Sequence, residues 1–226
     1  MNDSIAGVRQ GAASYPLSIL DFALAGKGLT AQQALTASIE LARLVDRRGF
    51  SRYWVAEHHS SPGVTTSSPA MLLARLVGET KQIRLGAGGM MLPNFPPLVV
   101  AEQFGLLASM APGRIDLGVG RAPGTDMNTA AALRRGQIGA EDFPSQLMEL
   151  LAFLDDDFPD SHPFKTDVYA IPGPRQCSGK WCTGFVCSSA DLAVGLLGLL
   201  GTPGGATGLS VCLRRSPGGP ECGYGN

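Results

Sequence analysis

The sequence predicts a parallel α/β fold made of four strand–helix units, which is the first half of a (β/α) barrel. Four short apolar segments begin about 30 residues apart, with a helical pattern between each pair. Polar residues follow the predicted strand ends, where barrels hold their active sites. A doubly wound sheet would require a glycine-rich turn after the first strand, and ALAGKGLT lacks G-x-G-x-x-G. The barrel is therefore the better interpretation.

The strands are predicted from short apolar runs that end in polar or glycine residues. They are Tyr15–Phe22, Arg52–Glu57, Ile83–Gly88 and Ile115–Val119. The carboxyl ends of parallel strands meet at one edge of a sheet. We therefore expect the residues that follow these four segments to lie near one another.

The helices are predicted from capping signals and apolar periodicity. Thr30 and Gln33 form a capping-box pattern, and Gly49 suits the C-terminal cap of the same helix. Prolines at helix starts predict helices over Ser68–Glu79 and Pro96–Met110. A last helix is expected over Glu141–Leu154. The buried stripe of the first helix is expected to contain Ala34, Ala37, Leu41, Leu44 and Val45.

Composition supports a folded core and argues against some partners. The 226 residues are 44% hydrophobic and 16% charged, with a net charge of −1. Near-neutral charge provides no electrostatic reason to bind nucleic acid or an anionic membrane. The N-terminus has no apolar segment typical of a secretory signal, so we expect a cytoplasmic protein.

The pattern breaks near residue 175, so residues 1–175 and 176–226 are treated as separate regions. The second region has five charged residues, 12 of the 30 glycines and all five cysteines. We expect it to be poorly ordered. A zinc site of Cys177, Cys182 and Cys187, a disulfide framework and a membrane span over Leu192–Leu213 are alternatives. A coding-frame slip or truncation near residue 176 explains all these features together and is the favoured interpretation.

The strongest candidate for chemistry is the pair His58 and His59, which follows the second predicted strand. A histidine there can transfer a proton near neutral pH. A metal site with Glu57 is disfavoured because alternate side chains point to opposite faces. Arg121 follows two glycines and could bind phosphate, and Gly86–Gly89 offers a surface without side chains. An ordinary loop pair and a surface arginine remain the alternatives.

Several long segments together resemble bacterial luciferase-like flavin monooxygenases, in particular the single-chain members called LLM-class flavin-dependent oxidoreductases. They are LSILDF, RYWVAEHH, IRLGAGGMMLPNFPPLVVAEQF and APGRIDLGVGRAPGTD, and the resemblance covers about residues 15–175. It implies a (β/α)₈ barrel that uses reduced FMN and dioxygen to oxidise an organic substrate such as a long-chain aldehyde. It also implies that residues 176–226 depart from the family.

The resemblance implies a role for each candidate residue. His58 matches the catalytic histidine, and Arg121 matches an arginine at the FMN phosphate. Gly88 and Gly89 match a pair beside the isoalloxazine ring that is often joined by a cis peptide. Glu57 is taken as cofactor-binding, and Glu102 and Asp126 match polar positions near the site. No metal is expected.

The resemblance also implies partners and leaves rival functions open. A separate flavin reductase would supply reduced FMN, and a homodimer is possible in this family. One rival is a deazaflavin-dependent oxidoreductase of the same barrel family. The other is a half-barrel fragment without catalytic activity.

Overall fold

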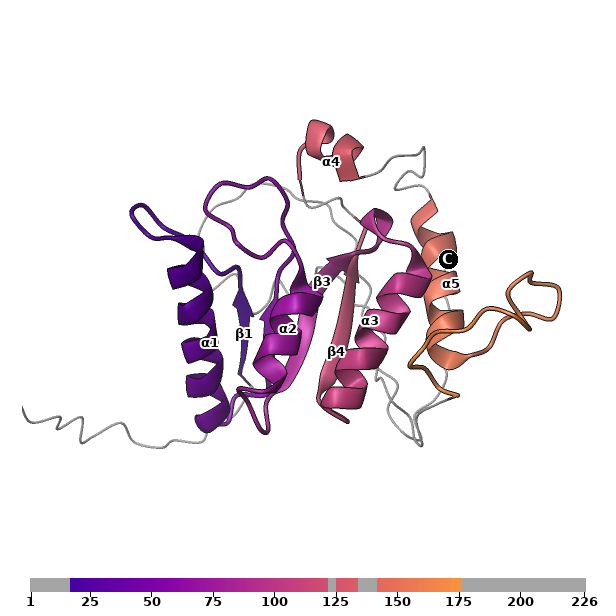
Figure 1. The fold of residues 1–226 in the computed structure, drawn as a ribbon, viewed down its shortest axis with the longest axis horizontal. Coiled ribbons are helices and arrows are strands. Elements are labelled where there is room, and N and C mark those ends of the chain that lie inside the picture. The colour runs from indigo at the N-terminus through magenta and orange to yellow at the C-terminus, as the bar shows by residue number, and fades with distance from the viewer. Residues whose placement is uncertain (1–16, 122–124, 134–141, 176–226) are drawn as a thin grey trace, which may run out of the picture.

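The computed structural model describes residues 17–121, 125–133 and 142–175 (Figure 1). The predictions for Cys177, Cys182, Cys187, Leu192–Leu213 and the rest of 176–226 lie outside the described residues. Within the described ranges, no helix has both the length and the apolar character needed to cross a bilayer.

Four parallel strands form one sheet in the order β1-β2-β3-β4, which confirms the predicted strand–helix repeat. The strands are β1 (Ser18–Asp21), β2 (Arg52–Val55), β3 (Arg84–Met91) and β4 (Ile115–Gly120). Sequential order is the barrel arrangement, whereas a doubly wound sheet reverses direction within the order. Strand β2 ends before Glu57, because the His58 amide bonds to Thr66 in the following loop instead of to a strand.

The described residues form helices between the strands and after β4. They are α1 (Ala31–Arg47), α2 (Pro69–Val77), α3 (Pro97–Met110), α4 (Met127–Leu133) and α5 (Phe143–Asp155), with a 3-10 turn, η1 (Leu92–Asn94), after β3. Helices α1, α2 and α3 cover one face of the sheet side by side, whereas α5 packs beside α3 and α4 lies beyond the carboxyl ends of the strands (Figure 1). Helices α1, α2, α3 and α5 agree with the prediction to within a few residues, whereas α4 was not predicted.

The core lies between the sheet and these helices. On the sheet, Val55 and Leu85 are fully buried, and Leu117 is 2% exposed. On the helices, Leu73 and Phe104 are fully buried in the same cluster. Burying an aliphatic or aromatic side chain stabilises a fold by about 1.5–3 kcal/mol. This layer therefore holds the four units together.

Helix α1 begins as predicted but buries a different stripe. The Thr30 side chain and the Gln33 amide and side chain form the capping box. Gly49 follows the helix with a φ of 74°, which glycine adopts without strain. The expected stripe was partly wrong, because Ala37 and Leu44 are exposed. The residues that are buried in α1 are Ala34, Ser38, Ala42 and Val45.

The other face of the sheet is called the inner face, because it would line the interior of a barrel. The pairing register aligns Leu20 with Trp54 and Trp54 with Gly86, which places all three on one face. A Cβ added at Gly88 would lie 3.1 Å from Trp54 Cβ and 3.2 Å from Leu20 Cδ1, so Gly88 also faces this side.

A carboxylate at the end of α1 binds the backbone just before the start of β3. The Asp46 carboxylate, in the last turn of α1, accepts hydrogen bonds from the amides of Lys81, Gln82 and Ile83 at 2.7–2.9 Å. Burial alone would raise the pKa of Asp46, but the three amides lower it below its usual value. The contact joins α1 to the residues that lead directly into β3.

Candidate active site

The predicted site residues gather at the carboxyl edge of the sheet. Glu57, His58 and His59 follow β2, Gly88 and Gly89 lie near the end of β3, and Arg121 follows β4. Since the strands are parallel and sequential, these ends are neighbours (Figure 1). The carboxyl edge of a parallel α/β sheet is where such folds place their ligands.

His58 lies beside an aromatic ring that follows β1. Its imidazole centroid is 5.5 Å from that of Phe22, with the rings tilted by 31°. Its amide donates to the carbonyl of Thr66 at 2.9 Å, which holds the backbone against the next loop. The imidazole is half-buried, so it combines a fixed backbone with access from outside. This suits a histidine that donates a hydrogen bond or a proton to a ligand.

Glu57 has a fully buried carboxylate whose two oxygens are both bonded to the protein. Oε2 accepts from the Met91 amide at 2.9 Å. Oε1 lies 2.8 Å from His59 Nε2 and 3.3 Å from Asn94 Nδ2. Burial raises the pKa of Glu57 above its usual value, although the three donors oppose this.

His59 turns the opposite way from His58, towards Glu57. An ionised carboxylate can only accept, so Nε2 is the ring nitrogen that carries hydrogen when Glu57 is ionised. The alternation expected for consecutive residues is therefore observed, with Glu57 and His59 together and His58 beside Phe22. Among the described residues, no group of three histidine, cysteine, aspartate or glutamate side chains is arranged to hold a metal ion.

Gly88 and Gly89 are joined by a cis peptide bond, as the resemblance implies. The two glycines lie inside β3 instead of after it, where the β3–β4 register shifts between Ala87 and Met90. A Cβ on Gly89 would lie 2.9 Å from the carbonyl oxygen of Gly118, so the close approach to β4 requires glycine. Both glycines are nevertheless half-exposed, which leaves a strip of bare backbone at the site.

Arg121 is the first residue after β4, and it is exposed. Its neighbours Val119 and Gly120 are buried in the strand, so Arg121 is the residue at which the chain leaves the sheet. A cation at this position can meet an anionic ligand that lies across the strand ends. The distances to such a ligand depend on the ligand itself.

The family described as luciferase-like monooxygenase matches residues 16–174, which is more than half of the chain. The chain belongs to the luciferase-like monooxygenase family. This confirms the resemblance drawn from the segments around His58, Gly88 and Arg121. It also places the four-stranded sheet and its one-sided helices in the barrel class of that family.

Relatives of this luciferase-like chain are similar over most of its length. The uncharacterized protein YvbT of Bacillus subtilis is 48% identical over 183 residues, covering 81% of this chain and 53% of the relative. The luciferase-like monooxygenase of Escherichia coli K12 is 43% identical over 180 residues, covering 79% and 52%. The crystal structure of apo-MsnO8 has a TM-score of 0.65 at 38% identity, covering 81% and 53%. The chain thus spans about half the length of these relatives.

Two further residues that the resemblance placed near the site, Asp126 and Glu102, have hydrogen-bond partners within the protein. Asp126 caps helix α4, accepting from the amides of Asn128 and Thr129 and from the Thr129 hydroxyl. These hydrogen bonds lower the pKa of Asp126, with the Thr129 hydroxyl contributing most. Glu102 lies on α3 and accepts from the Ile171 amide at 3.3 Å.

Asp21, a polar residue at the end of β1, accepts a hydrogen bond from the Tyr53 hydroxyl at 2.6 Å.

A charged cluster at the amino end of the inner face was not predicted from the sequence. Asp116 is fully buried and pairs with Arg84 through both carboxylate oxygens, while Arg52 Nε lies 3.2 Å from Asp116 Oδ2. Trp54 lies above it, and a Cβ on Gly86 would come within 2.5 Å of the indole. An aspartate in the apolar run IDLGV was the available signal, but its partners depend on strand register.

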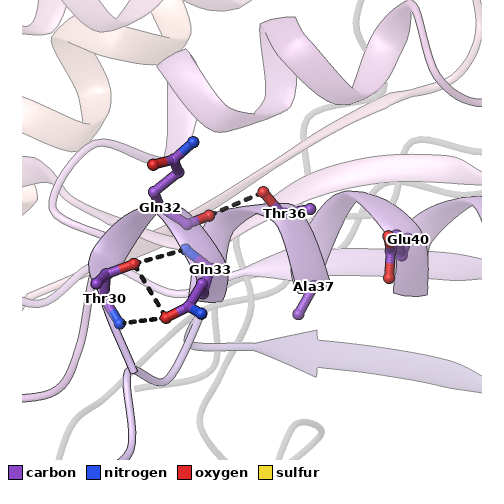
Figure 2. Close-up of a pocket in the computed structure, with 6 residues that line it drawn as sticks. All are labelled: Thr30, Gln32, Gln33, Thr36, Ala37 and Glu40. Carbon is purple, nitrogen blue, oxygen red and sulfur yellow. Dashed lines mark hydrogen bonds between the residues drawn. The ribbon is translucent and has the colours of Figure 1, made fainter. Parts of the chain in front are cut away.

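A separate hollow lies on the outside of α1. Figure 2 shows its lining by Thr30, Gln32, Gln33, Thr36, Ala37 and Glu40, with the capping-box hydrogen bonds drawn. These are residues of one helix surface and its cap. The side chains are engaged in helix capping or exposed to solvent, so this hollow contributes no chemistry to the carboxyl edge of the sheet.

Proposed function

We propose that this chain provides one half of the active site of an FMN-dependent monooxygenase, which uses reduced FMN and dioxygen to oxidise a small organic substrate. The observation that carries the proposal is the meeting of His58, the Gly88–Gly89 peptide and Arg121 at one edge of a luciferase-like sheet. A separate flavin reductase would supply the reduced flavin, and assembly as a homodimer belongs to the same proposal.

The residues present fit a flavin. The bare backbone at Gly88 and Gly89 would support a flat ring, because neither residue projects a side chain over it. Leu20, which faces Gly88, and Phe22, which lies beside His58, would supply apolar contacts to the ring. Arg121 would hold the phosphate through its planar guanidinium, which matches phosphate oxygens better than a lysine does.

The chain's own residues would orient and protonate while the bound FMN supplies the reaction with dioxygen. His58 would donate a hydrogen bond from its imidazole to the reacting region and deliver or accept a proton there. Arg121 would bind and orient the flavin by its phosphate. The Phe22 ring beside His58 would limit the access of water to the imidazole.

The name of the family favours FMN over a deazaflavin. Monooxygenation requires a flavin that reacts with dioxygen, whereas deazaflavins act mainly by hydride transfer. Matches to luciferase-like monooxygenases at more than 40% identity therefore support FMN.

Flavin binding tests this proposal directly. The purified chain is titrated with oxidised FMN, reduced FMN and a deazaflavin, and binding is followed by flavin fluorescence and absorbance. Preferential binding of FMN is expected, and binding of the deazaflavin alone would overturn the choice of cofactor. Binding of none would favour the fragment without catalytic activity.

Activity is tested in a longer protein, because the chain spans about half of its relatives. In this full-length chimera, the residues after Pro174 are replaced by the corresponding second half of the Escherichia coli relative. Consumption of reduced FMN coupled to formation of an oxidised product is the expected result.

A further inference from the structure

One buried carboxylate connects the ends of two strands at the candidate active site. Glu57 is fully buried, and its carboxylate accepts from the Met91 amide at the end of β3 and from the His59 ring after β2. Three donors meet the two oxygens of this side chain, so both oxygen positions must accept. A carboxylate has two accepting oxygens, whereas an amide has only one. Both oxygens of Glu57 are therefore engaged by the protein.

His59 extends this connection to a third strand end. Its ring contacts Glu57, and its main-chain carbonyl accepts the Thr125 hydroxyl at 2.8 Å. Thr125 follows Arg121 by four residues in the segment after β4. The single residue His59 thus joins the loops that follow β2 and β4, while Glu57 joins β2 to β3.

The pair Glu57 and His59 is called the bracket. It flanks His58, the residue proposed to act on the flavin. His58 stands between them in sequence and lies on the opposite side, beside Phe22. The 2.8 Å contact between Glu57 and His59 therefore restrains the backbone on both sides of His58. The Glu57 carboxylate also accepts from the amide of Met91, which lies two residues after Gly89 in β3. Glu57 is therefore connected to the strand that carries the Gly88–Gly89 peptide.

We propose that Glu57 and His59 are positioning residues that set the spacing of His58, the Gly88–Gly89 peptide and Arg121 without themselves touching the flavin. This inference rests on the proposed function for its flavin part only. It replaces the expectation that Glu57 binds the cofactor directly.

Two substitutions at His59 form a matched pair. His59→Gln places an amide N–H near the position of Nε2, so it can still donate to Glu57. His59→Asn places its amide near Nδ1, too short to reach the carboxylate. Both remove the imidazole ring. The side chain of His59 is only 13% exposed, so both variants lose buried contacts of the ring, and the comparison between them isolates the donor to Glu57.

Two measurements are made on wild type and both variants. The first is the dissociation constant for oxidised FMN from fluorescence titration. The second is hydrogen exchange of the Met91 amide by NMR without flavin. We expect His59→Asn to weaken FMN about tenfold and to speed Met91 exchange about tenfold, with His59→Gln within threefold of wild type.

Each outcome decides the inference. Equal behaviour of wild type and His59→Asn in both measurements would overturn it, and so would equal loss in the two variants, since the donor to Glu57 would then be irrelevant. If wild type binds no FMN, the proposed function fails separately. Met91 exchange then decides the bracket alone: faster exchange in His59→Asn only would support it, and unchanged exchange would overturn it.

Discussion

The three residues after β2 divide their roles by the direction of their side chains. Glu57 and His59 turn towards each other, and His58 turns to the side of Phe22. This division agrees with the alternation of neighbouring side chains that the sequence predicts for this segment, although β2 itself ends at Val55. One short segment thus provides both a group that is able to transfer protons and the contacts that hold its backbone.

His58 is expected to act on the reaction more than on flavin binding. In the full-length chimera, His58→Ala should lower turnover by about 100-fold or more, because general acid–base catalysis contributes at least that factor. The affinity for FMN should change little. Steady-state kinetics and a flavin titration measure the two effects, and unchanged turnover would place the proton transfer elsewhere.

Arg121 is expected to distinguish FMN from riboflavin. A charge-assisted contact to phosphate is worth about 1.5–3 kcal/mol, so Arg121→Ala should weaken FMN about 10- to 100-fold and leave riboflavin nearly unchanged. The matched control is Arg48→Ala, which removes an exposed arginine at the C-terminal end of α1, away from the strand ends. Equal weakening of both flavins would exclude the phosphate role of Arg121.

At the scale of elements, the end of α1 departs from the usual residue preference of a helix C-terminus because of a tertiary contact. A helix C-terminus favours basic residues, yet Asp46 lies in the last turn. Its carboxylate accepts three amides that precede β3, at 2.7–2.9 Å. Each hydrogen bond to a charged group is worth more than one between neutral groups. These hydrogen bonds therefore outweigh the unfavourable helix dipole.

Asp46→Asn is expected to lower the free energy of unfolding by about 1–2 kcal/mol at pH 7, because one amide of the three would then face an NH₂ group. The lowered pKa means that the folded state binds fewer protons than the unfolded state. The contribution is therefore present above about pH 4 and is lost as the pH falls through the folded pKa.

Urea unfolding at pH 7 and at pH 3.5 measures this dependence. The difference between wild type and Asp46→Asn should shrink at the lower pH. Glu40→Gln, an exposed change on the same helix, should leave stability nearly unchanged at both. A difference between wild type and Asp46→Asn that stays constant with pH would contradict the role of the ionised carboxylate.

At the scale of the molecule, the described residues form one arc of a barrel. The sheet has β1 and β4 as its outer strands, and the chain spans about half the length of its relatives. Active sites of barrels are assembled from loops around the whole ring. His58, the Gly88–Gly89 peptide and Arg121 would therefore supply one side of the flavin site.

The 226-residue chain is expected to bind FMN more weakly than the full-length chimera and to show no appreciable coupled turnover. A half-site admits water, which uncouples flavin oxidation from substrate oxidation. Parallel titrations and product assays of the two proteins measure this. Equal coupled turnover would show that residues 176–226 complete the site in their own way.

Much of the fold could be predicted from local patterns. The capping box at Thr30, the proline starts of α2 and α3, and the spacing of four apolar runs all rest on neighbours in sequence, and all are present. The stripe of α1 was less predictable. Ala37 and Leu44 match helical periodicity, but the face of α1 that packs against the sheet is the one that carries Ser38, whose carbonyl accepts the Tyr53 hydroxyl.

The sequence by itself determined the strand–helix order, the family and the segments that carry His58, Gly88 and Arg121. Only the tertiary structure decided which buried charges meet. Asp116 lies beside Arg52 and Arg84 because strand register places them together, and Glu57 reaches Met91 across 34 positions of chain. Local patterns depend on backbone geometry within a few residues, whereas these contacts depend on how separate strands align. That alignment is the result of packing the whole sheet against its helices.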